Sequence, residues 1–482
     1  MEILVTNAAE ITNALSECGG KPGDVLIMAN GTWRNQIISF VGKGTAQAPV
    51  ILRAQTPGQV ILTGNSRLQM AGEYLVVNGL RFQGGALTNG QKVIEFRISS
   101  SSVASFSRLT NTAIINYNPR LSSTDYDWIG LYGTNNRVDH CAFVGKNHKG
   151  PLLVVWRPTS APDFHQIDHN YFADFESGNG QNEWETIRIG TSTNSLSNSS
   201  SLVESNLFYR CNGEIEVISV KAGDNTLRYN TFDSCQGMLT LRHGRANRVQ
   251  GNFFFGQGVA DSGGIRIIDS HHVVVNNYLE GLTGTAGRAA LVLANGLYNS
   301  SLKGYFAAQH VTVAFNTIYN CREALRIGWR SHVNSEKVRD SVIANNVIQS
   351  FFSVSSTVTA LSIIVQEDPP LNLIYQGNYV FGSPGTMNLG IAANAGIIEK
   401  DPYLIRAADG LMRPAADSPL ISGAAAYDDL VSVDMDGQVR WGAKTVGADQ
   451  VVVVGSQAIR QRPFTDADVG RMIGPSWWRW GL

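Results

Sequence analysis

The sequence predicts an all-β protein, a right-handed parallel β-helix, and two observations lead to this fold. First, an Asn followed by aromatic or aliphatic residues recurs after 24, 22 and 25 residues, at Asn206, Asn230, Asn252 and Asn277. Repeats of this length indicate a solenoid. Second, the segments between these Asn residues are short and β-rich, without amphipathic helices of about 10–15 residues, which argues against helical and leucine-rich solenoids.

The composition agrees with many short strands joined by tight turns. Charged residues make up only 16% of the 482 residues, while there are 49 glycines. Glycine and Asn favour turns, whereas long surface helices carry more charge. The formal net charge of -1 excludes a globally basic protein. Attraction to an anionic partner must therefore come from a local patch, and we expect no nucleic-acid partner.

The Asn column itself is interpreted as structural. Its members should occupy one tight turn of each coil, where each side chain can bond to the coils above and below. Longer intervals between some members indicate loops inserted into those coils. The full series comprises Asn170, Asn206, Asn230, Asn252, Asn277, Asn316, Asn346 and Asn378.

Both ends of a solenoid must be covered. Residues 8–16 have apolar side chains at helical spacing, which predicts an N-terminal capping helix over the first coil. The repeat weakens near residue 395. We therefore expect a catalytic β-helix domain over residues 1–395, and irregular final coils with a C-terminal tail over residues 396–482. The tail contains Trp477, Trp478 and Trp480, and packing on the body is favoured over a separate sugar-stacking platform.

Cysteines and hydropathy give further expectations. Five cysteines do not form a disulfide framework, and Cys211, Cys235 and Cys321 each lie five residues after a repeat Asn, which predicts buried free thiols.

The sequence has no apolar stretch approaching about 18 residues, so no transmembrane span is expected. It also begins without a signal peptide. We expect a secreted or periplasmic monomer whose signal peptide is not part of this sequence.

A second column contains basic residues in an apolar-Arg pattern, at Arg188, Arg242, Arg266 and Arg326, and we expect Lys221 to occupy the matching place on its own coil. Coils stack at about 4.8 Å, so these cations should form a ladder on one face. A solvated basic ridge is the alternative. A groove for a polyanion is favoured, because Lys221 follows two acidic residues closely and the ladder would repel itself without an anion.

Acidic residues precede this column. Glu214 and Glu216 are two residues apart, so on a strand both side chains would point the same way. Asn182 and Glu185 lie 32 and 31 residues earlier, plausible for the preceding coil. An Asn oxygen with several carboxylates suits Ca²⁺ better than Zn²⁺, because no Cys/His set accompanies it. A salt-bridge network with Arg188 and Arg242 is an equally open alternative from spacing alone.

The stretch from Asn182 to Ile268 closely resembles the chondroitinase B-like family of polysaccharide lyases, family 6, which includes alginate lyases and dermatan sulfate lyases. The matching strings are residues 185–190, 213–216, 241–244 and 264–268, and the likeness covers nearly the whole chain. By this resemblance the general base falls on Lys221 and the acid on Arg242. The Ca²⁺ ligands fall on Asn182, Glu214 and Glu216, with Glu185 as a further candidate. The positions that contact substrate fall on Arg188, His243 and Arg266. Asp269 stands where a glycine is expected.

The resemblance implies Ca²⁺-assisted β-elimination of an acidic polysaccharide, with alginate preferred as the substrate. A dermatan sulfate lyase is the nearest alternative. A β-helix glycoside hydrolase would need carboxylates as acid and base, and we see no Asp cluster beside Lys221 and Arg242. A non-catalytic polysaccharide-binding β-helix would not need a lysine beside two carboxylates. The loops expected to wall the groove are residues 191–201 and 300–309.

Overall fold

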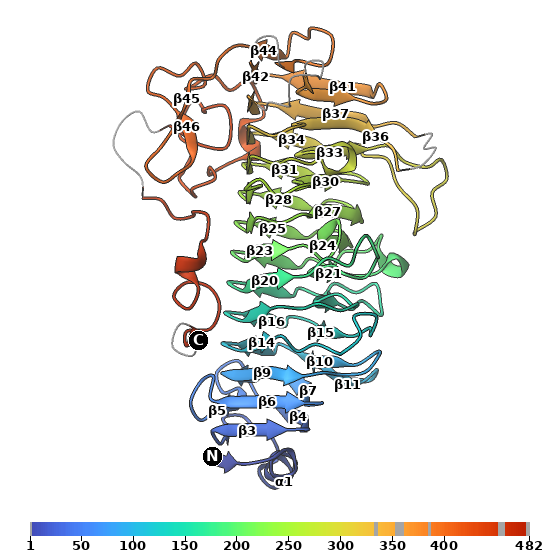
Figure 1. The fold of residues 1–482 in the computed structure, drawn as a ribbon, viewed down its shortest axis with the longest axis vertical. Helices are drawn as coiled ribbons and strands as arrows, with labels where there is room; N and C mark the ends of the chain where they lie inside the picture. Colours follow the sequence, from blue (N-terminus) through green and yellow to red (C-terminus); the bar gives the residue numbers. More distant parts are fainter. Residues whose placement is uncertain (1, 332–335, 352–360, 384–386, 452–457, 479–482) are drawn as a thin grey trace. The chain divides into compact units, whose positions relative to one another are not determined.

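The computed structural model describes residues 2–331, 336–351, 361–383, 387–451 and 458–478. The chain forms a right-handed parallel β-helix and divides into two compact units. Unit 1 comprises residues 1–222 together with 464–482, and unit 2 comprises residues 223–463. Figure 1 shows successive strands of each unit stacked coil upon coil. The predicted domain boundary at residue 395 stays a prediction.

Each coil contributes one strand to each of three parallel sheets, which are named A1, B1 and C1 in unit 1. Sheet A1 contains β1 (Glu2–Val5), β2 (Val25–Met28), β5 (Val50–Ala54), β8 (Leu75–Asn78), β13 (Arg108–Thr110), β16 (Arg137–Asp139), β19 (Gln166–Asp168) and β22 (Leu202–Glu204). Sheet B1 contains β3 (Gly31–Arg34), β6 (Val60–Gly64), β9 (Leu80–Gly85), β14 (Ala113–Ile115), β17 (Ala142–Val144), β20 (Tyr171–Phe175) and β23 (Leu207–Cys211).

Sheet C1 positions most of the predicted site. It contains β7 (Arg67–Glu73), β10 (Lys92–Glu95), β15 (Asp127–Leu131), β18 (Leu153–Val155), β21 (Ile187–Ile189) and β24 (Glu216–Lys221) in this order. At its N-terminal end β4 (Ile37–Lys43) and β12 (Ser102–Ser105) also pair with β7, and β11 (Arg97–Ser99) pairs with β12 in antiparallel orientation.

Unit 2 repeats the arrangement in sheets A2, B2 and C2. Sheet A2 contains β25 (Thr226–Arg228), β28 (Arg248–Gln250), β31 (Val273–Val275), β34 (Thr312–Ala314), β37 (Arg339–Ala344) and β41 (Leu371–Gln376). Sheet B2 contains β26 (Thr231–Asp233), β29 (Phe253–Phe255), β32 (Tyr278–Glu280), β35 (Thr317–Tyr319), β38 (Val347–Ser350), β42 (Asn378–Gly382) and β44 (Ile397–Glu399). Sheet C2 contains β27 (Met238–His243), β30 (Ile265–Ile267), β33 (Leu291–Ala294), β36 (Leu325–Trp329) and β40 (Ile364–Gln366).

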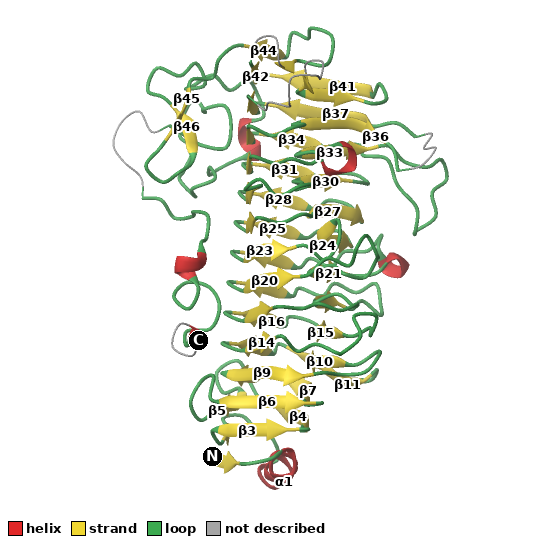
Figure 2. Ribbon diagram, viewed as in Figure 1, coloured by secondary structure: helices red, strands yellow, loops and turns green. Residues whose placement is uncertain are grey.

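Helix is scarce, as Figure 2 shows. The one α-helix of the described residues is α1 (Ala8–Cys18), which confirms the predicted N-terminal helix and extends it by two residues. The Asn7 side chain caps its first turn by accepting a hydrogen bond from the Glu10 amide, and Gly19 ends it with a φ of 79°. Ile11 and Ala14 are buried and face the first coils. Among the described helices, none is long and apolar enough to span a membrane.

The Asn column is confirmed as a turn ladder. In unit 2 the side-chain amide of each Asn donates to the Oδ1 atom of the Asn one coil further on, over 2.9–3.0 Å, from Asn230 to Asn378. Asn170 and Asn206 make the same bond in unit 1. These side chains are fully or almost fully buried, so the ladder satisfies backbone and amide groups that water cannot reach.

Two further expectations about packing can be compared with the structure. All five cysteines are free, and Cys211, Cys235 and Cys321 are buried thiols, as predicted. Near the C-terminus, Phe464, Val469 and Ile473 pack with residues of sheet B1 in one apolar cluster of unit 1, and Trp477 and Trp478 lie against the same cluster. Trp480 lies outside the described residues.

Candidate active site

Three carboxylates of unit 1 converge at the start of neighbouring strands of sheet C1. Oxygen atoms of Glu185, Glu214 and Glu216 all lie within 4.8 Å of one another. Ile187 pairs with Ile218, so Glu185 and Glu216 stand opposite each other on adjacent coils. Glu214 lies in the bend before β24 rather than on the strand, yet its carboxylate reaches the same point. Asn182 is an exposed loop residue three positions before Glu185.

The carboxylates differ in their partners. The Ser219 hydroxyl donates a short hydrogen bond to Oε2 of Glu216. Oε1 of Glu185 lies 3.4 Å from Nζ of Lys221, whereas Oε2 of Glu185 is buried without a hydrogen-bond partner. Such buried orphan oxygens are rare unless an ion or water fills the gap. Three clustered oxygen ligands with one orphan atom fit a hard cation such as Ca²⁺.

Lys221 closes β24 at the edge of this cluster, with 21% of its side chain exposed. It does not occupy the place equivalent to Arg188, because β21 and β24 pair Arg188 with Ser219. In unit 2 the strands pair Arg266 with Thr240, so Arg242 is likewise displaced by two residues from the Arg266 column. The single basic ladder expected from the sequence is therefore wrong. In unit 1, Arg188 and Lys221 lie in two neighbouring columns. In unit 2, Arg266 and Arg326 share one column and Arg242 lies in the neighbouring one.

Arg188 is 8% exposed and lies on β21. Its guanidinium carbon is 5.1 Å from the centre of the Trp156 ring. Within the described part of the chain, no carboxylate forms an ion pair with Arg188, although its neighbours Arg157 and Lys92 pair with Asp163 and Asp127. A buried cation without an acidic partner is suited to an anionic ligand.

Arg242 and His243 end β27 in unit 2, and the inserted loop expected at residues 300–309 holds Arg242. The guanidinium donates to the carbonyl oxygens of Gly304 (2.8 Å) and Lys303 (3.3 Å). It also lies 4.1 Å from the centre of the Tyr305 ring and 3.4 Å from Nδ1 of the buried His243. Arg266 is buried, 5.4 Å from the centre of the Trp329 ring. Asp269, where a glycine was expected, has a φ of 74° and an ion pair with Arg245.

The sequence reasoning missed the aromatic partners of these arginines, which are Trp156, Tyr305 and Trp329. It also missed Lys146, which is completely buried in unit 1 and donates to the His148 carbonyl over 2.5 Å. Burial lowers the pKa of Lys146 well below its usual value, although the charges of Asp127 and Glu185 oppose this shift. In the sequence, Trp156 is marked only by its position directly after the apolar residues Leu153–Val155. That position indicates a place near Arg188 only when the register between the strands is known.

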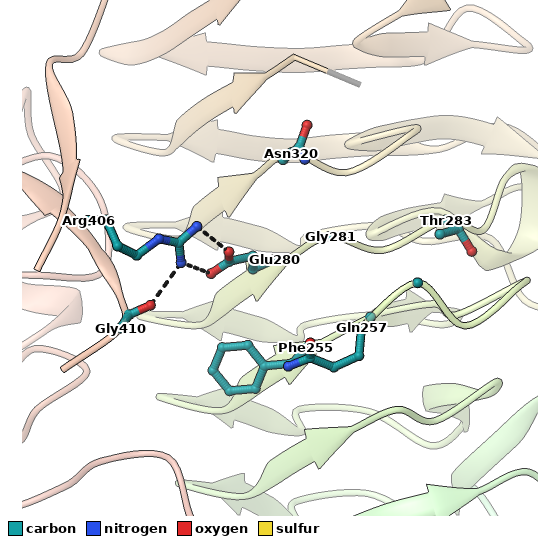
Figure 3. A pocket seen from close by; sticks show the side chains of 10 residues that line it. Phe255, Gln257, Glu280, Gly281, Thr283, Asn320, Arg406 and Gly410 are labelled. Atoms are coloured by element: carbon teal, nitrogen blue, oxygen red, sulfur yellow. Dashed lines mark hydrogen bonds and ion pairs between the residues drawn. The ribbon is translucent and has the colours of Figure 1, made fainter. Parts of the chain in front are cut away.

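Unit 2 also contains a cavity and a second group of acidic residues, neither of which includes a predicted site residue. A cavity of about 620 Å³ is lined in part by Glu280 and Arg406, which form an ion pair. Figure 3 shows this pair with Gln257, Thr283 and Asn320, which line the same cavity. Asp434, Asp436 and Asp449 form a second group of three acids. Arg413 lies 2.6 Å from Asp436 and 3.0 Å from Asp449, so a cation of the chain already lies beside two of these carboxylates.

Comparisons with known proteins agree on one family. The family model described as Chondroitinase B matches residues 5–423. The solved structure of the PL6 family alginate lyase AlyGC is 38% identical with a TM-score of 0.79, covering 86% of this chain and 56% of that one. This chain therefore spans little more than half of the length of AlyGC. No curated protein matches the chain.

Two further solved structures cover most of both chains. A mannuronic acid specific polysaccharide family 6 lyase from human gut microbiota is 31% identical with a TM-score of 0.68, covering 80% of this chain and 87% of that one. The PL6 family polysaccharide lyase Pedsa3628 from Pseudopedobacter saltans is 27% identical with a TM-score of 0.65, covering 82% and 97%.

Proposed function

The chain belongs to the chondroitinase B-like polysaccharide lyase family 6, and we propose that it cleaves alginate, a 4-linked uronate polymer, by β-elimination. The observation that carries the proposal is the position of the Lys221 amine, 3.4 Å from one carboxylate of a three-carboxylate cluster. A lysine in this place can remove a proton from a sugar whose own carboxylate is held at the cluster. A simple binding protein has no need of this arrangement.

We propose that Glu185, Glu214 and Glu216, with Asn182, hold one Ca²⁺. The orphan Oε2 of buried Glu185 and the all-oxygen donor set support this assignment. When bound, the cation would neutralise the uronate carboxylate and so make the C5 proton easier to remove. The negative charge of the three glutamates would otherwise repel the substrate.

Lys221, in its uncharged form, acts as the general base that takes the C5 proton. Arg242 acts as the acid that stabilises or protonates the departing O4, a role taken from the family resemblance. Arg188, His243 and Arg266 bind the substrate. The guanidinium of Arg188, which forms no ion pair with a described carboxylate, supports a contact with a sugar carboxylate, because such pairs are strong and directional.

Alginate is proposed over dermatan sulfate because the relatives at 38% and 31% identity carry the descriptions alginate lyase and mannuronic acid specific lyase. We also propose that the protein is secreted or periplasmic and acts as a monomer, since its substrate is an extracellular polymer.

The test is the formation of unsaturated uronate, followed by its ultraviolet absorbance after mixing the protein with alginate or dermatan sulfate. We expect absorbance to rise with alginate and the chain length of the polymer to fall. New reducing ends without absorbance would instead indicate a hydrolase, and binding without cleavage would indicate a non-catalytic protein. A rise with dermatan sulfate alone would transfer the proposal to that substrate.

A further inference from the structure

A column of side chains leads from Lys221 toward the N-terminal coils on the outer face of sheet C1. The strands pair Leu131 with Val155, Val155 with Ile189, and Ile189 with Val220. These four residues are completely buried and point into the helix. Because side chains alternate along a strand, the residues that follow them point outward. These residues are Tyr132, Trp156, Gly190 and Lys221.

The column continues one coil further to Arg97. Glu95 pairs with Gly130, and the Phe96 amide donates to the Gly130 carbonyl, so Arg97 stands opposite Tyr132. The guanidinium carbon of Arg97 lies 3.9 Å from the centre of the Tyr132 ring. The rings of Tyr132 and Trp156 are parallel to within 7°, with centres 6.3 Å apart. Arg97 therefore lies at one end of a pair of stacked rings along the coil axis.

Gly190 is buried in the column between Trp156 and Lys221. Its φ is 78°, and a Cβ atom there would come within 2.7 Å of the Lys221 carbonyl oxygen. The Arg157 side chain lies 3.3 Å from the same point, so glycine is required here by the close approach of the Lys221 backbone beside Trp156. Arg188, the guanidinium without an acidic partner, faces the same indole from the neighbouring column.

We propose that this column, Arg97, Tyr132, Trp156, Gly190 and Lys221, is a track that binds successive sugars of a polyuronate, and we call it the C1 track. The inference rests on the proposed function and deepens it by assigning new binding residues. Coils rise by about 4.8 Å, close to the length of one pyranose unit, so one sugar corresponds to about one coil. Trp156 lies two coils and Arg97 four coils from Lys221, which places Arg97 about 19 Å away.

The chemistry of the track fits an acidic sugar chain. Arg188 and Arg97 offer planar guanidinium groups to carboxylates, and the Trp156 ring offers an apolar surface to a sugar face. Arg97 shares its charge with Glu95 at 2.8 Å, but 33% of its side chain remains exposed. A stack that served stability alone would not need a partly exposed guanidinium at its end.

Length dependence distinguishes a binding track from a structural stack. Binding is measured by calorimetry in the Lys221→Ala background, which prevents cleavage, with saturated oligomannuronates from disaccharide to heptasaccharide. We expect Trp156→Ala to weaken binding from the trisaccharide upward. Arg97→Gln should weaken binding by about tenfold, but only for the pentasaccharide and longer chains that reach four coils from Lys221.

Arg53→Gln is the matched control. Arg53 is on sheet A1, is 35% exposed in its side chain and pairs with Glu2, so it resembles Arg97 in charge and exposure. It should leave affinity unchanged at every length. An equal loss at all lengths in Arg97→Gln, or no loss at any length, would overturn the track. The lyase proposal can fail independently of the track. In that case the wild-type protein forms no unsaturated product, but it still binds long chains more tightly than short ones.

Discussion

The amine of Lys221 is the proposed general base and the carboxylates beside it are the proposed metal ligands, and single substitutions separate these two roles. Lys221→Ala removes the group that takes the C5 proton, so kcat should fall by about 10²–10⁴. Arg242→Ala should be similarly severe, and Arg242→Lys should rescue it poorly because an ammonium lacks the planar fork. The rate of unsaturated uronate formation measures both effects. Lys43→Ala, an exposed lysine paired with Glu73, is the control and should keep full activity. Near-normal turnover of Lys221→Ala would place the base elsewhere, with His243 as the next candidate.

The carboxylate cluster is tested by metal content independently of activity. We expect one Ca²⁺ per chain, and Glu185→Gln or Glu216→Gln should weaken its binding strongly, because each removes one charged ligand from the set. Calcium titration of chelator-treated protein gives the affinity. Glu280→Gln is the control, since that carboxylate is bound by Arg406 in the cavity of Figure 3. Equal Ca²⁺ affinity in Glu185→Gln and wild type would remove Glu185 from the ligand set.

At the scale of the element, the Asn ladder should account for much of the stability of the coils in unit 2. Asn277 donates to Asn316 and to the Val249 carbonyl, and accepts from Asn252, all in fully buried positions. Asn277→Ala leaves these groups without partners, so the free energy of unfolding should fall by about 3 kcal/mol. Urea unfolding measures the change. Asn372→Gly is the control, because this exposed Asn bonds at the surface to Asp340 and has a φ of 50° that glycine tolerates, and it should lower the free energy of unfolding far less.

A second corner ladder contains His272, which takes the place that Asn225 and Asn247 hold on earlier coils. Its Nδ1 accepts a hydrogen bond from the backbone amide of Asn247, and its Nε2 donates one to the Ile268 carbonyl. Both nitrogens of the neutral ring therefore have hydrogen-bond partners. Burial lowers its pKa from 6.5 to about 4. The unfolded chain therefore binds a proton near pH 6.5 and the folded chain only near pH 4. Stability should fall as the pH is lowered through this window, and His272→Asn should make the decrease smaller in urea unfolding series. An unchanged slope would contradict the assignment.

The sequence could predict what depends on period and residue type. Asn230, Asn252 and Asn277 recur at one coil each and form the expected ladder. The acidic residues Glu185, Glu214 and Glu216 meet as expected. The register between strands could not be predicted, because the length of each strand is not visible in the spacing of the residues. This is why the displacement of Lys221 from the Arg188 column by two residues was not expected. The contact between Arg242 and Gly304 spans 62 residues and depends on the fold of an inserted loop.

At the scale of the whole molecule, stability is distributed between two units, and the C-terminal segment belongs to the first of them. Residues 464–478 return to unit 1 and cover sheet B1. Val469 and Ile473 are buried there, the Trp477 indole donates to the Asn111 carbonyl over 3.0 Å, and the Gly474 amide donates to the His169 carbonyl over 2.8 Å. The segment acts as an outer cover for apolar residues such as Ala142 and Leu207 that would otherwise face water.

Deletion of residues 464–482 should therefore destabilise unit 1 selectively. Removal of the segment exposes the apolar faces of β14, β17, β20 and β23, and burial of apolar surface contributes about 25 cal/mol per Å². Hydrogen exchange measured by mass spectrometry should rise in these strands and stay unchanged in β29, β32 and β35 of unit 2. The variant Ile473→Ala should produce a smaller increase in the same strands, as expected for a cavity in the cluster. A uniform rise in both units, or no change in sheet B1, would show that the segment does not stabilise unit 1.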